Sequence, residues 1–187
     1  MKEPYSIELF IIKPSVQLSI KKKILTKLRK AGFIIAVEKT ATFSFKDMSN
    51  FYSKENKELI GIGRATINFF KENNINIKKH FSKTTPLAIG KEIMKRQAKY
   101  MSSGPSTIII AMKQGKDIYK DAKAVVGSTF PERAEIGTIR NMSNDSLYSS
   151  TIENRAIHNF IHSSDKENVE KEIALIKKYT INGFNKQ

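Results

Sequence analysis

The amino-acid sequence predicts an α+β fold, a four-stranded antiparallel sheet covered by helices, with an extra helical insertion. Two observations predict it: short segments rich in β-branched and aromatic residues, and longer segments whose apolar residues recur at helical spacing. A chain of 187 residues favours a single domain over 1–187, which can bury roughly 70% of its unfolded surface without a covalent staple. The absence of cysteine excludes disulfides and thiolate metal sites, and only three histidines argue against an all-protein zinc cage.

The first third of the chain predicts a strand, a helix and a second strand. Ile7–Ile12 is apolar on both faces, as in a central covered strand, and Pro14 ends it because proline cannot donate to the ladder. Leu18–Ala31 is an amphipathic helix, with Gly32 just past its end. Phe33–Phe45, rich in Ile, Val, Thr and Phe, is the second strand.

The middle of the chain predicts helices. Asp47 caps a short helix that runs to Asn56. Residues 57–85 are interpreted as an inserted helical segment, in which Gly61-Ile62-Gly63-Arg64 marks a helix break rather than a phosphate loop, since no clear strand precedes it. Pro86 begins a helix that ends near Tyr100, because its fixed φ suits a first helical turn.

After a Ser-Gly-Pro turn, the second half predicts a third buried strand over Thr107–Met112. A helix over Asp117–Val126 follows, stopped by Gly127. Ser128–Ser150 has little apolar periodicity, and a loop this long inside a compact domain is usually functional or disordered.

The C-terminal part predicts a short fourth strand over Ala156–Ile161 and then the clearest helix of the chain. Ser164 with Glu167 gives a capping-box pattern. One face of the helix is apolar at Val169, Ile173 and Ile176. The resulting order, β-α-β-(α, α)-β-α-β-α, is a split βαβ, ferredoxin-like sandwich with extra helices.

The formal net charge is +15, an excess that attracts nucleotides, nucleic acid or acidic membrane surfaces. A lysine-rich solvated surface with a nucleotide substrate is the favoured explanation, although charge alone does not separate the two. Ile7–Ile12 is far too short to span a membrane, and the N-terminal region has no secretory cleavage pattern, so we expect a cytoplasmic protein without membrane contact.

Five segments match one family in order and spacing. They are the apolar run that ends in Lys13-Pro14, the turn Met101–Pro105, Gly127–Pro131, Gly137–Arg140 and Asn159–Asp165. Together they resemble the motifs of nucleoside diphosphate kinases. The resemblance covers both ends and most of the second half, and it weakens between Lys57 and Lys83, where the chain is longer than the common form.

The resemblance implies transfer of the γ-phosphoryl group from a nucleoside triphosphate, such as ATP or GTP, to a nucleoside diphosphate. The route is ping-pong through a phosphohistidine at His162. A neutral imidazole suits this chemistry because it is both a competent nucleophile and a good leaving group. It further implies Mg²⁺ held mainly by the nucleotide phosphates, with no protein metal site, and a tetrameric or hexameric homo-oligomer.

The same resemblance assigns roles to individual residues. Glu172 sets His162, Ser164 supports the histidine loop, and Tyr52 lies near the γ-phosphate. The residues that it places on phosphate or ribose are Lys13, Lys123, Thr129, Arg140 and Asn159. Ile93 and Gln97 fall near the offset expected for the apolar shelf that receives the nucleobase.

Several positions depart from the family pattern. Ser15 replaces an aspartate, and Lys123 replaces an arginine, which keeps the charge but loses the bidentate fork. Asn141-Met142 replaces Gly-Asp, and Ser163 replaces a glycine or alanine. These departures bear on rate and nucleotide affinity more than on the fold.

Each assignment has an alternative. A lone histidine near a strand is more often a packed residue than a catalytic one, and on this basis His158 is interpreted as structural and His80 as solvated. Two further readings are a ferredoxin-like nucleic-acid-binding module and a catalytically weakened regulatory homologue. An RNA-recognition sheet needs a Lys/Arg-Gly-Phe/Tyr stacking pattern that the chain lacks, so any nucleic-acid binding should be weak, non-specific and salt-sensitive.

Overall fold

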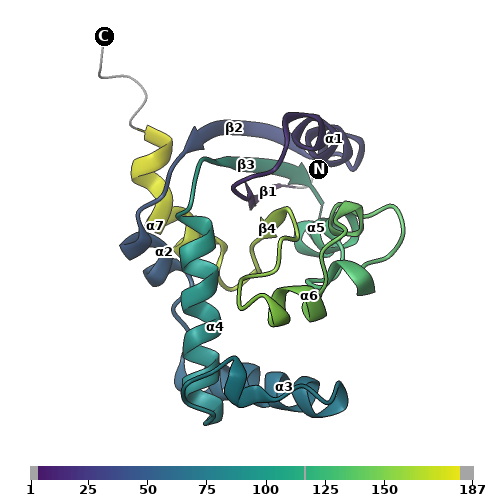
Figure 1. The fold of residues 1–187 in the computed structure, drawn as a ribbon. Coiled ribbons are helices and arrows are strands. Elements are labelled where there is room, and N and C mark those ends of the chain that lie inside the picture. The colour runs from purple at the N-terminus through teal and green to yellow at the C-terminus, as the bar shows by residue number, and fades with distance from the viewer. Residues whose placement is uncertain (1–3, 116, 182–187) are drawn as a thin grey trace.

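The computed structural model describes residues 4–115 and 117–181. A four-stranded sheet forms its centre, in the order β2-β3-β1-β4 (Figure 1), and every neighbouring pair is antiparallel. The fold prediction is therefore confirmed. The main elements are β1 Tyr5–Ile12, α1 Leu18–Lys30, β2 Ile34–Ala41, α2 Phe45–Phe51, α3 Asn56–Glu72, α4 Pro86–Met101, β3 Ser106–Gln114, α5 Ile118–Val126, α6 Leu147–Ile152, β4 Ile161–Ser163 and α7 Val169–Ile181. Three short 3-10 helices complete them, η1 Ile77–Lys79, η2 Pro131–Arg133 and η3 Arg140–Met142.

Helices cover both faces of the sheet. On one face, α1 and α5 pack against Phe10, Ile12 and Ile109, and we call this the α1/α5 face. On the other, α2, α4 and α7 pack against Leu9 and Ile11, and we call this the α7 face. Successive residues of a strand point to opposite faces, so β1 contributes to both cores, as its continuous apolar run predicts.

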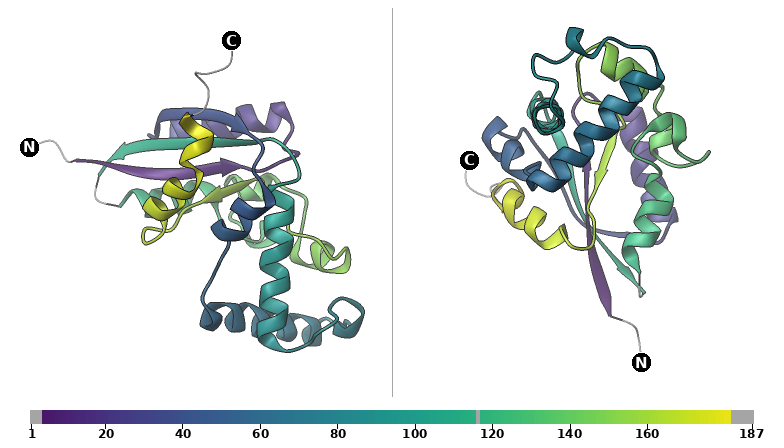
Figure 2. Two further views of the ribbon diagram at one scale, coloured as in Figure 1. Left: turned by 90° about the vertical axis from the view of Figure 1, so that its left-hand side faces the viewer. Right: turned by 90° about the horizontal axis from the view of Figure 1, so that it is seen from below.

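The helices α3 and α4 form an arm that projects from the sheet, with α3 at the far end of α4 (Figure 2). The two helices approach very closely: a Cβ added at Gly63 would lie 1.9 Å from the carbonyl oxygen of Pro86, and one at Gly90 would lie 2.1 Å from that of Leu59. The predicted helix break at Gly61 and Gly63 is wrong. Gly63 is instead the contact point that lets a continuous α3 pack on α4.

Four other local predictions need correction. The α2 helix begins after Ser44, whose Oγ accepts the N–H of Asp47, so Asp47 is not the cap. The fourth strand covers Ile161–Ser163 rather than 156–161, because it forms only where it pairs with β1. Ser164 does not cap α7, which begins at Val169. The predicted loop 128–150 contains η2 and η3, and α6 begins within it.

The ends of α1 and α5 agree with the sequence predictions. The α1 helix ends at Lys30, and Gly32 follows with φ +87°, a conformation that glycine adopts without strain. The α5 helix is capped by Asp117 and ends before Gly127. Among the described residues, no helix is both long and apolar enough to cross a membrane.

Candidate active site

A tight turn sets the position of β4. Phe160 has φ +67°, and the N–H of Ile161 donates to the carbonyl oxygen of Asn159 at 2.8 Å, which makes a γ-turn. The N–H of Lys13 donates to the carbonyl oxygen of Phe160, so the turn is fixed to the end of β1. A bulky residue with positive φ is strained and persists only where its surroundings hold it. This strained turn lies two residues before His162.

His162 stands on the α7 face of β4, opposite Ile11 of β1. Its Nε2 lies 2.9 Å from Oε2 of Glu172 on α7, and the hydroxyl of Ser164 donates to the same oxygen at 2.5 Å. An ionised carboxylate can only accept hydrogen bonds, so with Glu172 as acceptor the ring proton belongs on Nε2. The other ring nitrogen, Nδ1, then has a free lone pair.

Aromatic rings from α2 and its C-terminus pack against the histidine. The ring centroid of Phe51 lies 5.1 Å from that of His162 in an edge contact, and the centroid of Tyr52 lies 6.2 Å away. The Tyr52 hydroxyl is buried and has no hydrogen-bond partner within the described part of the chain. Burial, and then the Glu172 carboxylate, raise the pKa of Tyr52, so its hydroxyl stays protonated as a potential donor.

Two cations lie near each other beside the end of β1: Lys13, which follows the strand, and Arg140 of η3. Lys13 is only 4% exposed, and burial, followed by the Arg140 guanidinium, lowers the pKa of its ammonium to about 7. Burial also lowers the pKa of Arg140 to about 10. The ammonium of Lys13 lies 5.8 Å from the ring centroid of Tyr100. Cations held this far from water are favoured by an anion at the site.

Arg140 and Asn159 hold residues 127–129 and the start of β4 in place by hydrogen bonds to carbonyl oxygens. Arg140 Nη1 donates to the carbonyl oxygen of Gly127 at 3.0 Å, and Nη2 donates to that of Ile161 at 3.1 Å. Asn159 Nδ2 donates to the carbonyl oxygen of Thr129 at 2.7 Å, while its buried Oδ1 has no partner among the described residues. Gly127 has φ +86°, and an added Cβ would lie 2.4 Å from Thr138 Oγ1, so this turn requires glycine.

Two cavities meet beside this loop. The first, about 620 Å³, has a lining that includes Lys123, Gly127, Thr129, Arg140, Ser163 and Ser164, and we call it the phosphate cleft because its cations attract anions. The second, about 480 Å³, is the apolar pocket between the arm and α6, and its lining includes Ile62, Phe69, Ile93, Gln97, Phe130 and Ile157. Thr129 and Arg133 line both, so the two cavities are neighbours at these residues. Ile93 and Gln97, expected near the base, thus lie in the apolar pocket.

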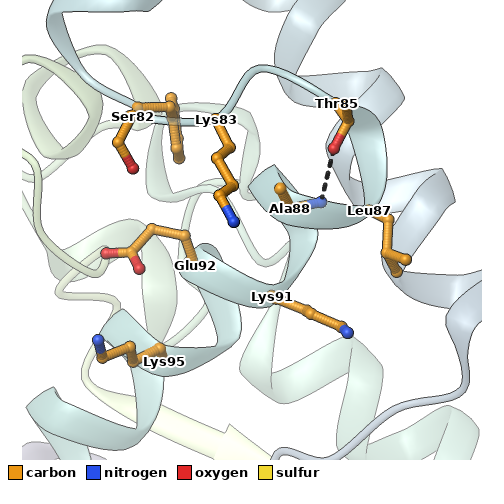
Figure 3. Close-up of a pocket in the computed structure, with 9 residues that line it drawn as sticks. Ser82, Lys83, Thr85, Leu87, Ala88, Lys91, Glu92 and Lys95 are labelled. Atoms are coloured by element: carbon orange, nitrogen blue, oxygen red, sulfur yellow. Dashed lines mark hydrogen bonds between the residues drawn. The ribbon is translucent and has the colours of Figure 1, made fainter.

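A third cavity, about 470 Å³, lies at the start of α4 (Figure 3). Lys83, Lys91, Glu92 and Lys95 line it, and none of the residues expected at the active site do so. It shares no lining residue with the phosphate cleft and is therefore separate from it.

The two remaining histidines lie outside the Glu172 network. His158 stacks on Tyr100 with ring centroids 4.4 Å apart, and the Tyr100 hydroxyl donates to the carbonyl oxygen of Pro14. Burial, and then the nearby Arg155, lower the pKa of His158. His80 is partly exposed; its Nδ1 lies 3.0 Å from Asn154 Oδ1, and its ring packs edge-on against Phe70.

The residues that depart from the family pattern have partners in this chain. Lys123 pairs with Asp165 at 3.2 Å, and Asn141 Nδ2 donates to the carbonyl oxygen of Ala134. The hydroxyl of Ser163 donates to Oε1 of Glu8 at 3.3 Å. Glu8 was not expected at the site, although one carboxylate inside an apolar strand is itself a signal. Phe51 was also missed, since a lone phenylalanine in a short helix is typical of any core.

The site does not offer a protein cage for a metal ion. Within residues 4–115 and 117–181, no group of three or more His, Asp or Glu side chains could hold one. The phosphate cleft is lined by Lys123, Arg133 and Arg140, with Glu135 and Asp165 as its carboxylates. Such a donor set fits an ion that is carried by phosphate oxygens.

Known proteins of one family resemble this chain. The model of the family described as "Nucleoside diphosphate kinase" matches residues 58–180. A nucleoside diphosphate kinase from Pyrobaculum aerophilum is 30% identical over 173 residues, 91% of this chain and 93% of the relative. The crystal structure of an NDP kinase from that organism has a TM-score of 0.86 at 27% identity, covering 95% of this chain and 99% of the other.

A more distant structure comes from Borrelia burgdorferi: a transition-state mimic of nucleoside-diphosphate kinase with bound vanadate and ADP. It has a TM-score of 0.68 at 16% identity, covering 95% of this chain and 91% of the other, a likeness of fold. The family match covers more than half of the chain, and the Pyrobaculum relative spans nearly all of it. The chain therefore belongs to the nucleoside diphosphate kinase family.

Proposed function

We propose that this chain exchanges γ-phosphoryl groups between nucleotides in two steps, with Nδ1 of His162 as the nucleophile. In the first step Nδ1 attacks the γ-phosphorus, the bond to the β-phosphate oxygen breaks, and the nucleoside diphosphate leaves. In the second, a different nucleoside diphosphate takes the phosphoryl group from Nδ1. The observation that carries the proposal is the contact of Nε2 with Glu172, since it leaves Nδ1 as the nitrogen with a free lone pair.

Glu172 would also stabilise the intermediate. Phosphorylation of Nδ1 puts positive charge on the ring, and a carboxylate 2.9 Å from Nε2 offsets that charge. The hydroxyl of Ser164 shares the same oxygen, which restricts the carboxylate to one orientation. Catalysis of phosphoryl transfer is mostly positioning and charge stabilisation, so a fixed orientation contributes directly to the rate.

The nucleotide phosphates would bind in the phosphate cleft. Lys123, Thr129 and Arg140 of its lining would supply donors, Lys13 would act from its buried position near Arg140, and the buried Tyr52 hydroxyl would supply another donor near His162. Mg²⁺ would enter with the nucleotide, held by phosphate oxygens, and would neutralise part of the charge that develops on them. The unpartnered Asn159 Oδ1 is suited to accept a hydrogen bond from a ribose hydroxyl.

The nucleobase would lie in the apolar pocket against Ile93 and Gln97. Apolar walls bind every base through its face, which accounts for a broad choice of nucleotides. One polar atom stands out there: Oε1 of Gln97 is buried without a partner in the described part of the chain. We expect homo-oligomers for this chain, as for the family, and a cytoplasmic location.

The test is to incubate the protein with ATP labelled in the γ-phosphate and to measure acid-labile label on the chain. A chase with unlabelled nucleoside diphosphate should move that label to the nucleotide. His162→Ala should abolish both reactions, whereas His158→Ala, the matched control on the same segment, should leave labelling of His162 intact. Label that persists in His162→Ala would contradict the proposal, and unlabelled wild-type protein that still binds nucleotide would favour the regulatory reading.

A further inference from the structure

Glu8 is a carboxyl group inside the sheet that the proposed reaction does not use. It sits in the middle of β1 and is fully buried, at 0% exposure. Because side chains alternate along a strand, it shares the α1/α5 face with Phe10 and Ile12, whereas His162 projects from the α7 face. The two residues therefore act from opposite sides of the same sheet.

The carboxyl of Glu8 holds the residues that directly follow His162. Its Oε1 accepts the N–H of Ser164 at 2.9 Å and the hydroxyl of Ser163 at 3.3 Å. The N–H of Ser164 also lies 3.1 Å from the carbonyl oxygen of Leu9. The N–H of Ser164 thus has two acceptors on β1. The one from Glu8 is a side-chain contact that strand pairing alone does not provide.

Burying a carboxyl group is unfavourable unless its oxygens are hydrogen-bonded, and the surroundings of Glu8 do not fully compensate for this cost. Oε2 is buried without a partner among the described residues. The titratable groups that interact electrostatically with Glu8 are Glu172 of α7, Asp165 of the segment before α7, and Tyr119 of α5. Burial, together with the two acidic neighbours, raises the pKa of Glu8 to about 8 against the lowering effect of its two serine donors.

A protonated Glu8 suits a site that must receive phosphates. At neutral pH the group is mostly uncharged, so it grips the serines without repelling the incoming nucleotide. A methionine would fill similar space in the strand at a lower desolvation cost, so packing alone does not explain a glutamate. The hydrogen bonds to Ser163 and Ser164, which follow His162, do explain the glutamate.

We propose that Glu8 is a positioning residue for phosphoryl transfer: it fixes Ser163 and Ser164 and thereby aligns Glu172 and His162. The path is short. Ser164 is held through its N–H by Glu8, and through its hydroxyl it holds Oε2 of Glu172, which lies against Nε2 of the histidine. Ser163, where the family has glycine or alanine, supplies the second donor, so Glu8 and Ser163 work as a pair. This inference rests on the proposed function.

The test compares Glu8→Met, which removes the acceptor, with Glu8→Gln, which keeps an acceptor oxygen at the same place. Single-turnover phosphorylation of His162 by ATP should slow roughly tenfold in Glu8→Met, the equivalent of one lost hydrogen bond, and at most about threefold in Glu8→Gln. The dissociation constant of a nucleoside diphosphate should stay within about twofold in both, and the melting temperature of Glu8→Met should equal or exceed that of the wild type.

Glu38→Met is the matched control, since this glutamate lies on β2 and forms an ion pair with Lys21. It should leave the rate unchanged. A Glu8→Met protein that reacts at the wild-type rate would overturn the inference. A rate loss accompanied by a lower melting temperature and shared equally by Glu8→Gln would also overturn it, because that pattern belongs to a purely structural residue.

A readout without turnover separates this inference from the proposed function. The ¹⁵N chemical shifts of the His162 ring report which nitrogen carries the proton. The wild type should hold it on Nε2, and Glu8→Met should shift the ring towards a mixture of tautomers, with Glu8→Gln close to the wild type. A wild type that is not phosphorylated would contradict the proposed function but not the role of Glu8. Identical ring shifts in all three proteins would contradict the role of Glu8 but not the proposed function.

Discussion

Burial lowers the pKa of the Lys13 ammonium, and the guanidinium of Arg140 lies close enough to lower it further, to about 7. Two cations therefore share one end of the site. Bound phosphates should restore the ordinary pKa of Lys13, because an anion stabilises its charged form.

Nucleotide binding should consequently take up a proton above pH 7. The free protein has largely lost the Lys13 proton at pH 8, and the complex regains it, so affinity should fall as pH rises, by up to roughly tenfold per pH unit. Calorimetry in two buffers of different ionisation enthalpy measures the uptake. Lys13→Met should remove it and Lys120→Met should not. An affinity that is constant from pH 7 to 9 would refute this explanation.

Ser164→Ala should slow phosphorylation of His162 by about tenfold, because Glu172 loses the hydroxyl that restricts its orientation. The binding of nucleoside diphosphate should change little. Single-turnover kinetics and equilibrium binding separate the two effects. Ser19→Ala, an exposed change on α1, serves as the control, and a rate equal to that of the wild type would show that Glu172 needs no such support.

Lys123→Arg should lower the KM for nucleotide, since a guanidinium fork grips two phosphate oxygens where an ammonium grips one. The gain should be a few-fold at most, because Lys123 is 70% exposed and already pairs with Asp165. Steady-state kinetics measure it, with Lys120→Arg on the same helix as the control. A higher KM would mean that the pocket has adapted to lysine.

The glycines of α3 offer a matched pair for stability. Gly63→Ala should destabilise the protein by about 2 kcal/mol or more, because its Cβ would meet the carbonyl oxygen of Pro86 at 1.9 Å. Gly61→Ala meets nothing within 4 Å and should stabilise it by up to about 1 kcal/mol through helix propensity. Denaturant unfolding measures both. Equal effects of the two changes would show that α3 does not pack on α4 at Gly63.

Glu8 should make stability depend on pH. Its pKa in the folded chain is about 8 against an ordinary value of 4.5, so the folded state keeps a proton that the unfolded chain releases in between. The free energy of unfolding should therefore fall as pH rises from about 5 to 8, by roughly 2–4 kcal/mol at most. The comparison is with Glu8→Gln, whose profile should lack this fall. Parallel profiles for the two proteins would assign the carboxyl an ordinary pKa.

Local signals in the sequence were sufficient for the elements that carry their own periodicity. The α1 helix with Gly32 after it, and α5 with its Asp117 cap, lie close to where they were predicted. The three-residue strand β4 was misplaced because its position comes from pairing with β1, a contact between distant parts of the chain. The continuous helix through Gly61 and Gly63 was missed for a similar reason: the close packing of α4, not the local sequence, makes Gly63 favourable there.

The same distinction applies to the site. His162, Glu172 and Ser164 could be named from motifs, and the structure brings these three together, although their roles remain predictions. Glu8 could not be connected to Ser164 from the sequence, since the two are 156 residues apart and meet only across the sheet. Sequence motifs named residues that line the phosphate cleft, but they could not reveal the buried hydrogen bond from Ser164 to Glu8.

The γ-turn at Phe160 also limits how this region of the gene can change. It sets the register of a strand only three residues long, in which Ile161 and Ser163 point to one face and His162 to the other. Adding or deleting one residue between the turn and Ser164 would move the imidazole to the wrong face of the sheet. Across this stretch, evolution is free to exchange side chains but not to alter length, whereas the surface loops elsewhere tolerate both.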